Sequence, residues 1–459
     1  MTSSASPSIV WTRQLGTSFS DTAQALTTGP DGAIYLVGST AGNLDGQING
    51  GTIVDYLSFD AFLTKYNPDG ARIWTRQLGT SFYDTAQALT TSKDGAIYLA
   101  GNTQGNLDEQ TNRGTSDVFL AKYNPDGTRV WVRLLGTSLY DSALALASGT
   151  DGAIYISGYT NGDLDGQRNS GGNDAFLAKY EADGKKVWTR LLGTTSNDYG
   201  YALTVGVDGE IYVAGYTEGN LDGQINSGKT DAFIARYSSE GEKVWTKLLG
   251  TNTEDRAWAL TTGTDGTIYL AGHTYGSLDS QKAFGGADVF IAKYSTEGTK
   301  VWTRLSGTPS SDDPFALTTG SDGSIYVAGI TDNNLDGQTN SGGISPVTRD
   351  AFIIRYNPDG TKVWTRLLGT TDIDVAKALT SGTDGSIYVA GYTWGALDGQ
   401  PNRGNSDIFI SRWLTDITIP VVPTFSISAN QTSINEGSIA TLNVTTTNVA
   451  SGTSLAYTL

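Results

Sequence analysis

The chain has 459 residues and a formal net charge of −17, from 47 acidic and 30 basic side chains. This acidic excess argues against nucleic acid and acidic membrane surfaces as partners, because both require clustered Lys and Arg. The absence of cysteine excludes disulfides, thiolate catalysis and cysteine-ligated metal sites.

The first element in chain order is Ile9–Leu15, which belongs to a phrase close to VWTR-x-L-G that recurs along the chain. Successive copies lie 57 to 63 residues apart, and a fixed period of this size indicates a repeat array. The phrase is marked by Trp11, Trp74, Trp131, Trp188, Trp245, Trp302 and Trp364. We expect these side chains to pack between repeats rather than to hold a cofactor.

Within each repeat, two hairpins predict four antiparallel strands. In the second full unit, Ala88–Thr91 and Ala96–Gly101 flank the turn SKDG, and Asp117–Tyr123 and Thr128–Leu134 flank NPDG. Asp-Gly pairs supply the positive φ that such turns require, and the arms have strand composition. Seven units of four strands predict an all-β, seven-bladed β-propeller of four-stranded antiparallel blades over residues 1–414.

The ends of the array predict how the ring closes. Ile9–Leu15 is a fourth strand with no preceding three, and Asp407–Trp413 is a third strand with no following fourth. We therefore expect the N-terminal strand to complete the last blade, which removes a free sheet edge.

The composition changes after Trp413. Residues 415–424, with Pro420 and Pro423, are typical of a short stiff linker. Residues 425–459 alternate apolar and polar side chains, which predicts a partial β-sandwich segment, an incomplete Ig-like β domain.

The repeats resemble a known family. Units such as DGAIYLAGNT, DVFLAKYNPDGTRVWVRLLG and their equivalents between residues 9 and 413 are similar to the bacterial SBBP-type seven-bladed β-propeller repeats. The resemblance implies a propeller on an exported or surface protein, with no common chemistry. The tail resembles Calx-β or related Ig-like modules of large cyanobacterial secreted proteins. That likeness implies an extracellular or cell-surface location and export by a type I pathway, since the N-terminus has no signal-peptide pattern.

A polar loop between the second and third strands of each unit, close to N-L-D-G-Q-x-N, is a candidate calcium site. Oxygen side chains alternate along it, as in calcium-binding loops. The candidate ligands are Asn43, Asp45, Gln47, Asn106, Asp108, Asp163, Asp165, Asn220, Asp222, Asn334 and Asp336. The alternative is that Asp and Asn form Asx turns while Gln bridges neighbouring backbone. Two of these loops, Asp45–Asp60 and Asp336–Asp350, are longer than the rest and are candidate binding loops.

A second set of carboxylates follows the fourth strand, on the same predicted face. Its members are Asp21, Asp84, Asp141, Asp198, Asp255, Asp312 and Asp374. They predict either an acidic binding face or caps of the turns into the next blade. Aromatic side chains that differ between units lie near this face and are candidates for stacking on a sugar: Tyr159, Tyr216, His273, Tyr392 and Trp394.

These features favour a non-enzymatic binding or adhesion module, monomeric and without membrane insertion, that recognises a protein or glycan ligand through its acidic loop face. The alternatives are a propeller enzyme (hydrolase, lyase or quinoprotein) and a purely structural spacer. No catalytic residue is assigned, because the single histidine, His273, has no equivalent in the other units.

Overall fold

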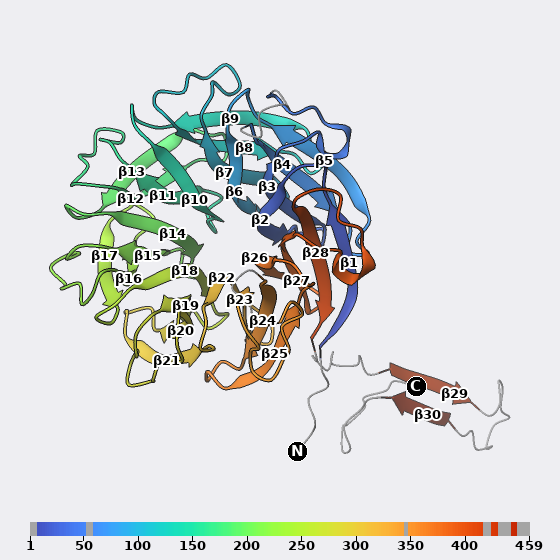
Figure 1. Ribbon diagram of the computed structural model, residues 1–459. Coiled ribbons are helices and arrows are strands. Elements are labelled where there is room, and N and C mark those ends of the chain that lie inside the picture. Colours follow the sequence, from blue (N-terminus) through green and yellow to red (C-terminus); the bar gives the residue numbers. More distant parts are fainter. Residues whose placement is uncertain (1–6, 52–57, 344–347, 416–423, 430–441, 448–459) are drawn as a thin grey trace, which may run out of the picture. The chain divides into compact units, whose positions relative to one another are not determined.

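Seven four-stranded antiparallel sheets surround a central axis in the computed structural model, which describes residues 7–51, 58–343, 348–415, 424–429 and 442–447 (Figure 1). The sequence prediction of an all-β, seven-bladed propeller is confirmed. Within its described residues, no helix is long and apolar enough to cross a membrane. The central parts of the two long loops, residues 52–57 and 344–347, lie outside the described residues.

The strands of each blade run from the axis outwards. The innermost strands are β2 (Asp21–Thr28), β6 (Asp84–Thr91), β10 (Asp141–Ser148), β14 (Asp198–Val205), β18 (Asp255–Thr262), β22 (Asp312–Thr319) and β26 (Asp374–Ser381). The second strands are β3 (Ile34–Thr40), β7 (Ile97–Thr103), β11 (Ile154–Thr160), β15 (Ile211–Thr217), β19 (Ile268–Thr274), β23 (Ile325–Thr331) and β27 (Ser386–Thr393). Blades are numbered 1 to 7 in this chain order.

The outer half of each blade has the same regularity. The third strands are β4 (Asp60–Tyr66), β8 (Asp117–Tyr123), β12 (Asp174–Tyr180), β16 (Asp231–Tyr237), β20 (Asp288–Tyr294), β24 (Asp350–Tyr356) and β28 (Asp407–Leu414). The outer strands are β5 (Arg72–Leu78), β9 (Arg129–Leu135), β13 (Lys186–Leu192), β17 (Lys243–Leu249), β21 (Lys300–Ser306), β25 (Lys362–Leu368) and β1 (Ser8–Leu15). Two short 3-10 turns, η1 (Leu44–Gly46) and η2 (Leu397–Gly399), belong to the loops between second and third strands.

The ring is closed by the two ends of the propeller. Strand β1 pairs antiparallel with β28, from Ser8 opposite Leu414 to Leu15 opposite Ile408. The first strand of the chain therefore completes blade 7, as the phase of the repeats predicts.

The core consists of layers between neighbouring blades. One such layer combines Tyr35 and Leu63 of blade 1 with Leu99 and Phe119 of blade 2, all at most 1% exposed. Because every blade buries apolar side chains only against its neighbours, stability depends on an unbroken ring.

Most of the repeated tryptophans lie against the last hairpin turn of the next blade, and Trp11, Trp74 and Trp245 also donate an indole hydrogen bond to it. Trp74 of blade 1 donates its indole N–H to the carbonyl of Pro125, 3.3 Å away in the last hairpin turn of blade 2. Arg76 lies 5.3 Å above the Trp74 ring and donates Nε–H to the carbonyl of Gly127 at 3.0 Å. Gly127 has φ +83°, and a Cβ there would approach the indole to 3.0 Å, so this turn requires glycine. Trp11 makes the equivalent bond to Pro68 at 3.1 Å.

The propeller, residues 6–415, and the unit containing the tail are separate compact units. In the tail, β29 (Thr424–Ala429) and β30 (Leu442–Thr447) pair antiparallel. The rest of the predicted Ig-like segment, and nearly all of the predicted linker 415–424, lie outside the described residues. The Calx-β resemblance stays a prediction.

Candidate functional site

The carboxylates at the start of the innermost strands are buried, so they do not form an exposed acidic face. Each of the seven is 0% exposed. Asp21 accepts the backbone N–H of Thr17 at 2.6 Å and its hydroxyl at 2.9 Å, and the other six make the same two bonds to a Thr four residues earlier. The geometry corresponds to the capping role. The predicted acidic binding face is therefore wrong for all seven residues: Asp21, Asp84, Asp141, Asp198, Asp255, Asp312 and Asp374.

A second buried aspartate lies beside each of these, across the boundary between blades. The backbone N–H of Asp84 donates to the carbonyl of Phe59 at 2.7 Å, which brings Asp60 of blade 1 next to it. Burial raises the pKa of Asp60 to about 7, with a contribution from the charge of Asp84. Burial likewise raises the pKa of Asp21 to about 6, beside Asp407. All of these aspartates are at most 2% exposed, so their carboxyl groups lie in the interior at the boundaries between blades.

The polar loops between the second and third strands, called the LDGQ loops below, are held to their blade by hydrogen bonds and ion pairs of their polar side chains. Asp108 has φ +52° in a tight turn, and its carboxylate pairs with Arg129 of β9 at 2.6 Å. Asn106 accepts the backbone N–H of Asn112 at 2.9 Å. Gln110 accepts the N–H of Leu134 at 3.0 Å. The remaining predicted carboxylates of these turns, Asp45, Asp165, Asp222 and Asp336, are also paired with Lys or Arg.

This donor set does not fit a calcium ion, which takes six to eight oxygens. Each loop offers one or two carboxylates. In blades 1 to 6 the one in the turn already neutralises a cation of the same blade, and in blade 7 Asp398 accepts a hydrogen bond from the Thr12 hydroxyl. Over the described parts of the chain, no group of three or more His, Asp or Glu side chains could hold a metal ion. The loop oxygens of Asn43, Asn220 and Asn334 accept backbone N–H groups within their own loops, at 2.8 to 3.0 Å.

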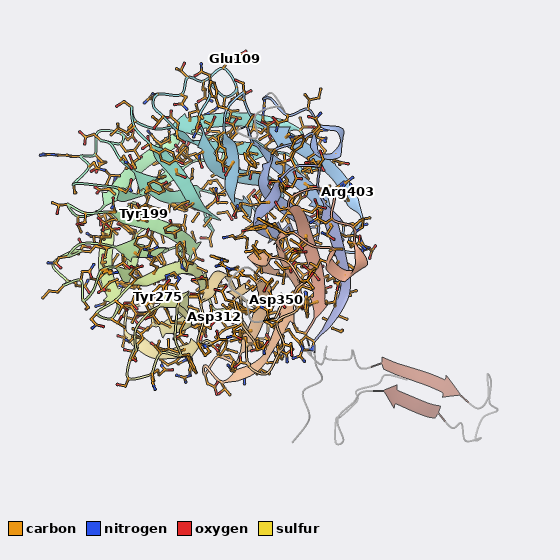
Figure 2. The ribbon with its side chains drawn as sticks, in the orientation of Figure 1. Glu109, Tyr199, Tyr275, Asp312, Asp350 and Arg403 are labelled. Atoms are coloured by element: carbon orange, nitrogen blue, oxygen red, sulfur yellow. The ribbon has the colours of Figure 1, made fainter. Side chains whose placement is uncertain are left out.

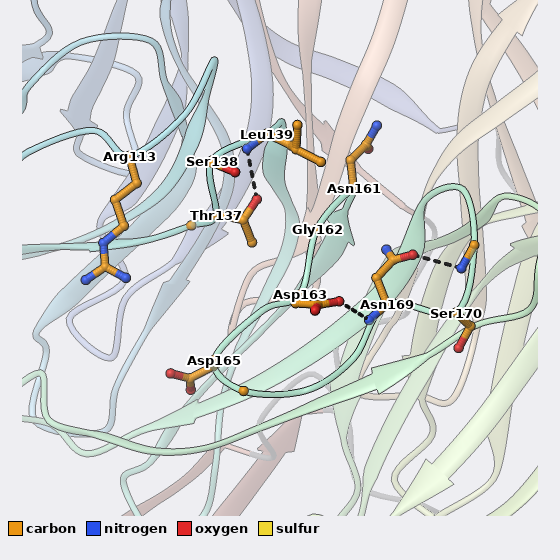
Figure 3. Close-up of a pocket in the computed structure, with 13 residues that line it drawn as sticks. Arg113, Thr137, Ser138, Leu139, Asn161, Gly162, Asp163, Asp165, Asn169 and Ser170 are labelled. Carbon is orange, nitrogen blue, oxygen red and sulfur yellow. Dashed lines mark hydrogen bonds between the residues drawn. The ribbon is translucent and has the colours of Figure 1, made fainter.

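A polar hollow of about 920 Å³ opens between the loops of blades 2 and 3. Arg113 faces it from one side, and Asp163, Asp165 and Asn169 from the other (Figure 3). Asp163 accepts the N–H of Asn169 at 2.9 Å. The loop residues that line this hollow recur in other blades. The hollow therefore offers no contacts that are specific to one part of the ring.

The innermost strands, in contrast, each point one variable residue toward the axis. The strand register slips at the third residue after the first Asp, so that one residue bulges out of the pairing in every blade. A β-bulge redirects a side chain. The seven bulge residues are Gln24, Gln87, Leu144, Tyr201, Trp258, Phe315 and Lys377. By contrast, the two residues that follow are Ala and Leu in all seven blades.

A pair of variable residues lies two positions before each bulge residue, nearer to the loops. The residue after each first Asp is opposite a second-strand residue, and both differ between blades: Thr22 with Ser39, Thr85 with Asn102, Ser142 with Tyr159, Tyr199 with Tyr216, Arg256 with His273, Asp313 with Ile330 and Val375 with Tyr392. Together with the bulge residues, these pairs are called the channel mouth below. The channel beneath it, about 180 Å³, is lined by all seven innermost strands.

Aromatic rings form a continuous cluster over blades 3 to 5. The ring centroids of Tyr159 and Tyr199 are 4.9 Å apart, those of Tyr199 and Tyr216 4.8 Å, and those of Tyr201 and Trp258 4.5 Å. Arg256 lies 4.7 Å from the Tyr216 ring centroid. The predicted candidates Tyr159 and Tyr216 are thus brought together by the fold, and Figure 2 shows where the neighbouring Tyr199 lies in the ring.

His273 joins the same cluster and bridges blades 5 and 6. Its ring centroid is 5.6 Å from that of Trp258, and its Nδ1 lies 2.5 Å from Oδ1 of Asp313. The imidazole is 6% exposed, so the carboxylate of Asp313 orients a nearly buried ring.

The other predicted aromatics, Tyr392 and Trp394, border a cavity of about 400 Å³ over blades 7, 1 and 2. Lys377 reaches it from the bulge of β26, and Gln24 and Gln87 reach it from β2 and β6. Burial lowers the pKa of the Lys377 ammonium to about 8. Trp394 remains 52% exposed.

Sequence reasoning missed Arg256, Trp258, Asp313 and Lys377. The signal was present, since the repeats can be compared with one another and these positions vary between fixed Asp and Ala-Leu residues.

Two segments match the SBBP repeat. The family described as "Beta-propeller repeat" matches residues 73–108 and 187–222. Both segments begin in an outer strand, cross into the first two strands of the next blade, and end at the Asp of its LDGQ loop.

The curated relatives are longer proteins. The regulatory protein FlaEY of Caulobacter vibrioides is 27% identical over 426 residues, covering 81% of this chain and 43% of that protein. An uncharacterized WD repeat-containing protein of Acanthamoeba polyphaga mimivirus is 22% identical over 431 residues, covering 72% of this chain and 31% of that protein. This chain therefore spans less than half the length of the curated relatives it matches.

Among solved structures, the WD40 domain of Neurospora crassa Pan2 is similar at a TM-score of 0.47. It is 10% identical, and the likeness covers 86% of this chain and 90% of that chain.

Proposed function

We propose that this chain is a non-enzymatic binding module of a bacterial extracellular protein, and that its protein or glycan ligand docks at the channel mouth. One observation carries the proposal: the framework is repeated seven times, while three linked positions around the axis carry different residues in different blades. A repeated scaffold with one variable surface presents specific contacts there and ordinary packing elsewhere.

The chemistry of the mouth supports recognition by stacking and hydrogen bonding. Aromatic rings bury large areas at low entropy cost and are enriched at binding hot spots. Arg256 lies over the Tyr216 ring, and Asp313 pairs with His273, which contacts Trp258, so the apolar surface has charged groups at its border. The name of the Caulobacter relative, a regulatory protein, also favours binding over catalysis.

The test compares the protein with a variant in which Tyr201→Leu and Trp258→Leu are combined. Blade 3 carries a leucine, Leu144, at the bulge position equivalent to Tyr201 and Trp258, so the framework tolerates leucine there. The pair of proteins is passed over a glycan array and a screen of bacterial surface proteins. A hit that weakens at least tenfold in the double variant, but not in a rim control such as Phe82→Ser, supports the proposal. Hits that ignore the double variant, or no hits at all, contradict it.

A second candidate function is a hydrolase or lyase, favoured by the His273–Asp313 contact. A histidine oriented by a carboxylate is the usual general base. The substitution His273→Tyr introduces the residue that blades 3, 4 and 7 carry at this position. The assay measures turnover of polysaccharide or ester substrates. Turnover that is lost in His273→Tyr while the melting temperature stays unchanged would show that the protein is an enzyme rather than a binding module.

A further inference from the structure

We propose that the cavity around Lys377 binds the carboxylate of an acidic sugar residue, with Trp394 and Tyr392 beside the sugar ring. This inference rests on the proposed function and names the ligand class for one sector of the channel mouth.

Lys377 is the only cation among the seven bulge residues, all of which lie in the described part of the chain. Its ammonium lies 3.5 Å from the ring centroid of Phe315 in blade 6. Among the described residues, no carboxylate lies within ion-pairing distance of its Nζ, and no hydrogen-bond acceptor is bonded to it, whereas Lys65, Lys122 and Lys179 all have such partners. The Lys377 side chain is partly buried, and a partly buried charge without a direct ion pair is unfavourable, so an anion in the cavity would stabilise it.

The cavity beside Lys377 has the size and lining of a small-ligand site. Its volume of about 400 Å³ falls within the range of about 300 to 1,000 Å³ typical of such sites. Hydroxyl and amide groups come from Thr22, Gln24, Thr85 and Gln87, on two neighbouring innermost strands. These groups both donate and accept hydrogen bonds, as the hydroxyls of a sugar require.

The aromatic part of the lining favours a sugar over a bare inorganic anion. Trp394 and Tyr392 of blade 7 stand on one side. On the other side, Phe59 and Tyr83 contact each other edge to face with centroids 5.2 Å apart. One cation, several amides and hydroxyls, and flat apolar surfaces together match a uronic acid, which has one carboxylate, several hydroxyls and apolar C–H faces.

The experiment uses the full chain, calorimetric titration, and two probes that differ in charge: an oligogalacturonate and its methyl-esterified, uncharged counterpart. The variant Lys377→Gln places in blade 7 the residue that blades 1 and 2 carry at the bulge, so folding is preserved. We expect the oligogalacturonate to bind, and Lys377→Gln to weaken it at least tenfold while binding of the neutral probe stays within twofold. Trp394→Ala should weaken both probes, and Lys229→Gln, an exposed lysine elsewhere, should change neither.

The pH dependence gives a second readout. The groups near the ammonium are Asp313 on β22, whose charge raises the pKa of Lys377, and the phenols of Tyr83 and Tyr392 in the cavity. Affinity for the oligogalacturonate should fall as pH rises from 7 to 9, because the ammonium loses its proton, and should be flat for Lys377→Gln.

The outcomes separate this inference from the proposed function. Equal binding of the charged and neutral probes, or no effect of Lys377→Gln, overturns the acidic-sugar site. Inhibition of oligogalacturonate binding by inorganic phosphate as strong as by galacturonate overturns the sugar and leaves a simple anion site. If neither probe binds but another ligand depends on Tyr201 and Trp258, this inference fails and the proposed function stands.

Discussion

The closure of the ring by β1 can be measured with an engineered disulfide, since the chain has no cysteine of its own. Thr12 of β1 and Ser411 of β28 are directly opposed, and their hydroxyl oxygens lie 3.1 Å apart. The pair Thr64 and Thr75 in blade 1 occupies equivalent strands, with the same register and the same 3.1 Å separation. Cysteines at either pair therefore meet the same local geometry.

The two bridges differ in the length of chain they close. Thr12 and Ser411 are 399 positions apart, whereas Thr64 and Thr75 are 11 apart. In the chain-entropy account, closing these loops in the unfolded state stabilises the protein by about 6 and about 3 kcal/mol. Because strain in the folded state is the same for both pairs, we expect the closure bridge to exceed the control by about 3 kcal/mol.

The assay is urea unfolding of each double-cysteine variant in oxidised and reduced form, followed by tryptophan fluorescence. All ten tryptophans lie in the propeller, so the signal reports this unit alone. Comparing each protein with its own reduced form cancels the loss of the threonine hydrogen bonds. Equal stabilisation by the two bridges would show that β1 does not confine the whole ring, and would refute the reasoning.

Three other predictions concern the framework. Glu109 and Ser280 have φ near +63° where five other blades have glycine, and Glu109 lies at the outer edge of the ring (Figure 2). Glu109→Gly and Ser280→Gly should each raise the free energy of unfolding by up to about 1 kcal/mol. This is the left-handed backbone strain that glycine relieves, minus the conformational entropy that glycine loses on folding. A loss of stability in urea titrations would contradict this. Burial raises the pKa of Asp60 to about 7 and of Asp21 to about 6, so the folded chain binds protons that the unfolded chain releases above about pH 4. Stability should therefore increase as pH falls from 7.5 to 5, less steeply in Asp60→Asn, and a melting temperature that falls over this range would disprove it. Finally, melting with calcium and with EDTA should coincide, because the loop carboxylates are already paired, and a higher midpoint with calcium would restore the metal site.

The framework could be predicted because it is periodic. The spacing of the tryptophans, the recurring Asp-Gly turns and the unpaired first and last strands determine the number of blades and their closure. The tryptophan phrase and the Asp-Gly turn are local in sequence and recur seven times, so an error in one unit is corrected by the others.

The channel mouth could be predicted only in part, because burial and direction depend on the docking of neighbouring blades. Asp84 looks like a surface carboxylate in sequence, and becomes buried because its backbone bonds to Phe59 of the preceding blade. Lys377 looks like an ordinary strand lysine, and reaches the axis because of a bulge that pairing with β27 creates. Tyr216 and His273 were identified because they vary between units, but their contacts with Trp258 and Asp313 cross blade boundaries.

The pairing of Ser8 with Leu414 also sets how the propeller responds to mechanical load. Both ends of the ring leave from the same end of one antiparallel ladder, so a pull between them acts on one hydrogen-bonded pair at a time. Such peeling needs far less force than shearing all the pairs together. Under tension the propeller should therefore open at the seam between β1 and β28 first, and then release its blades in turn from that seam.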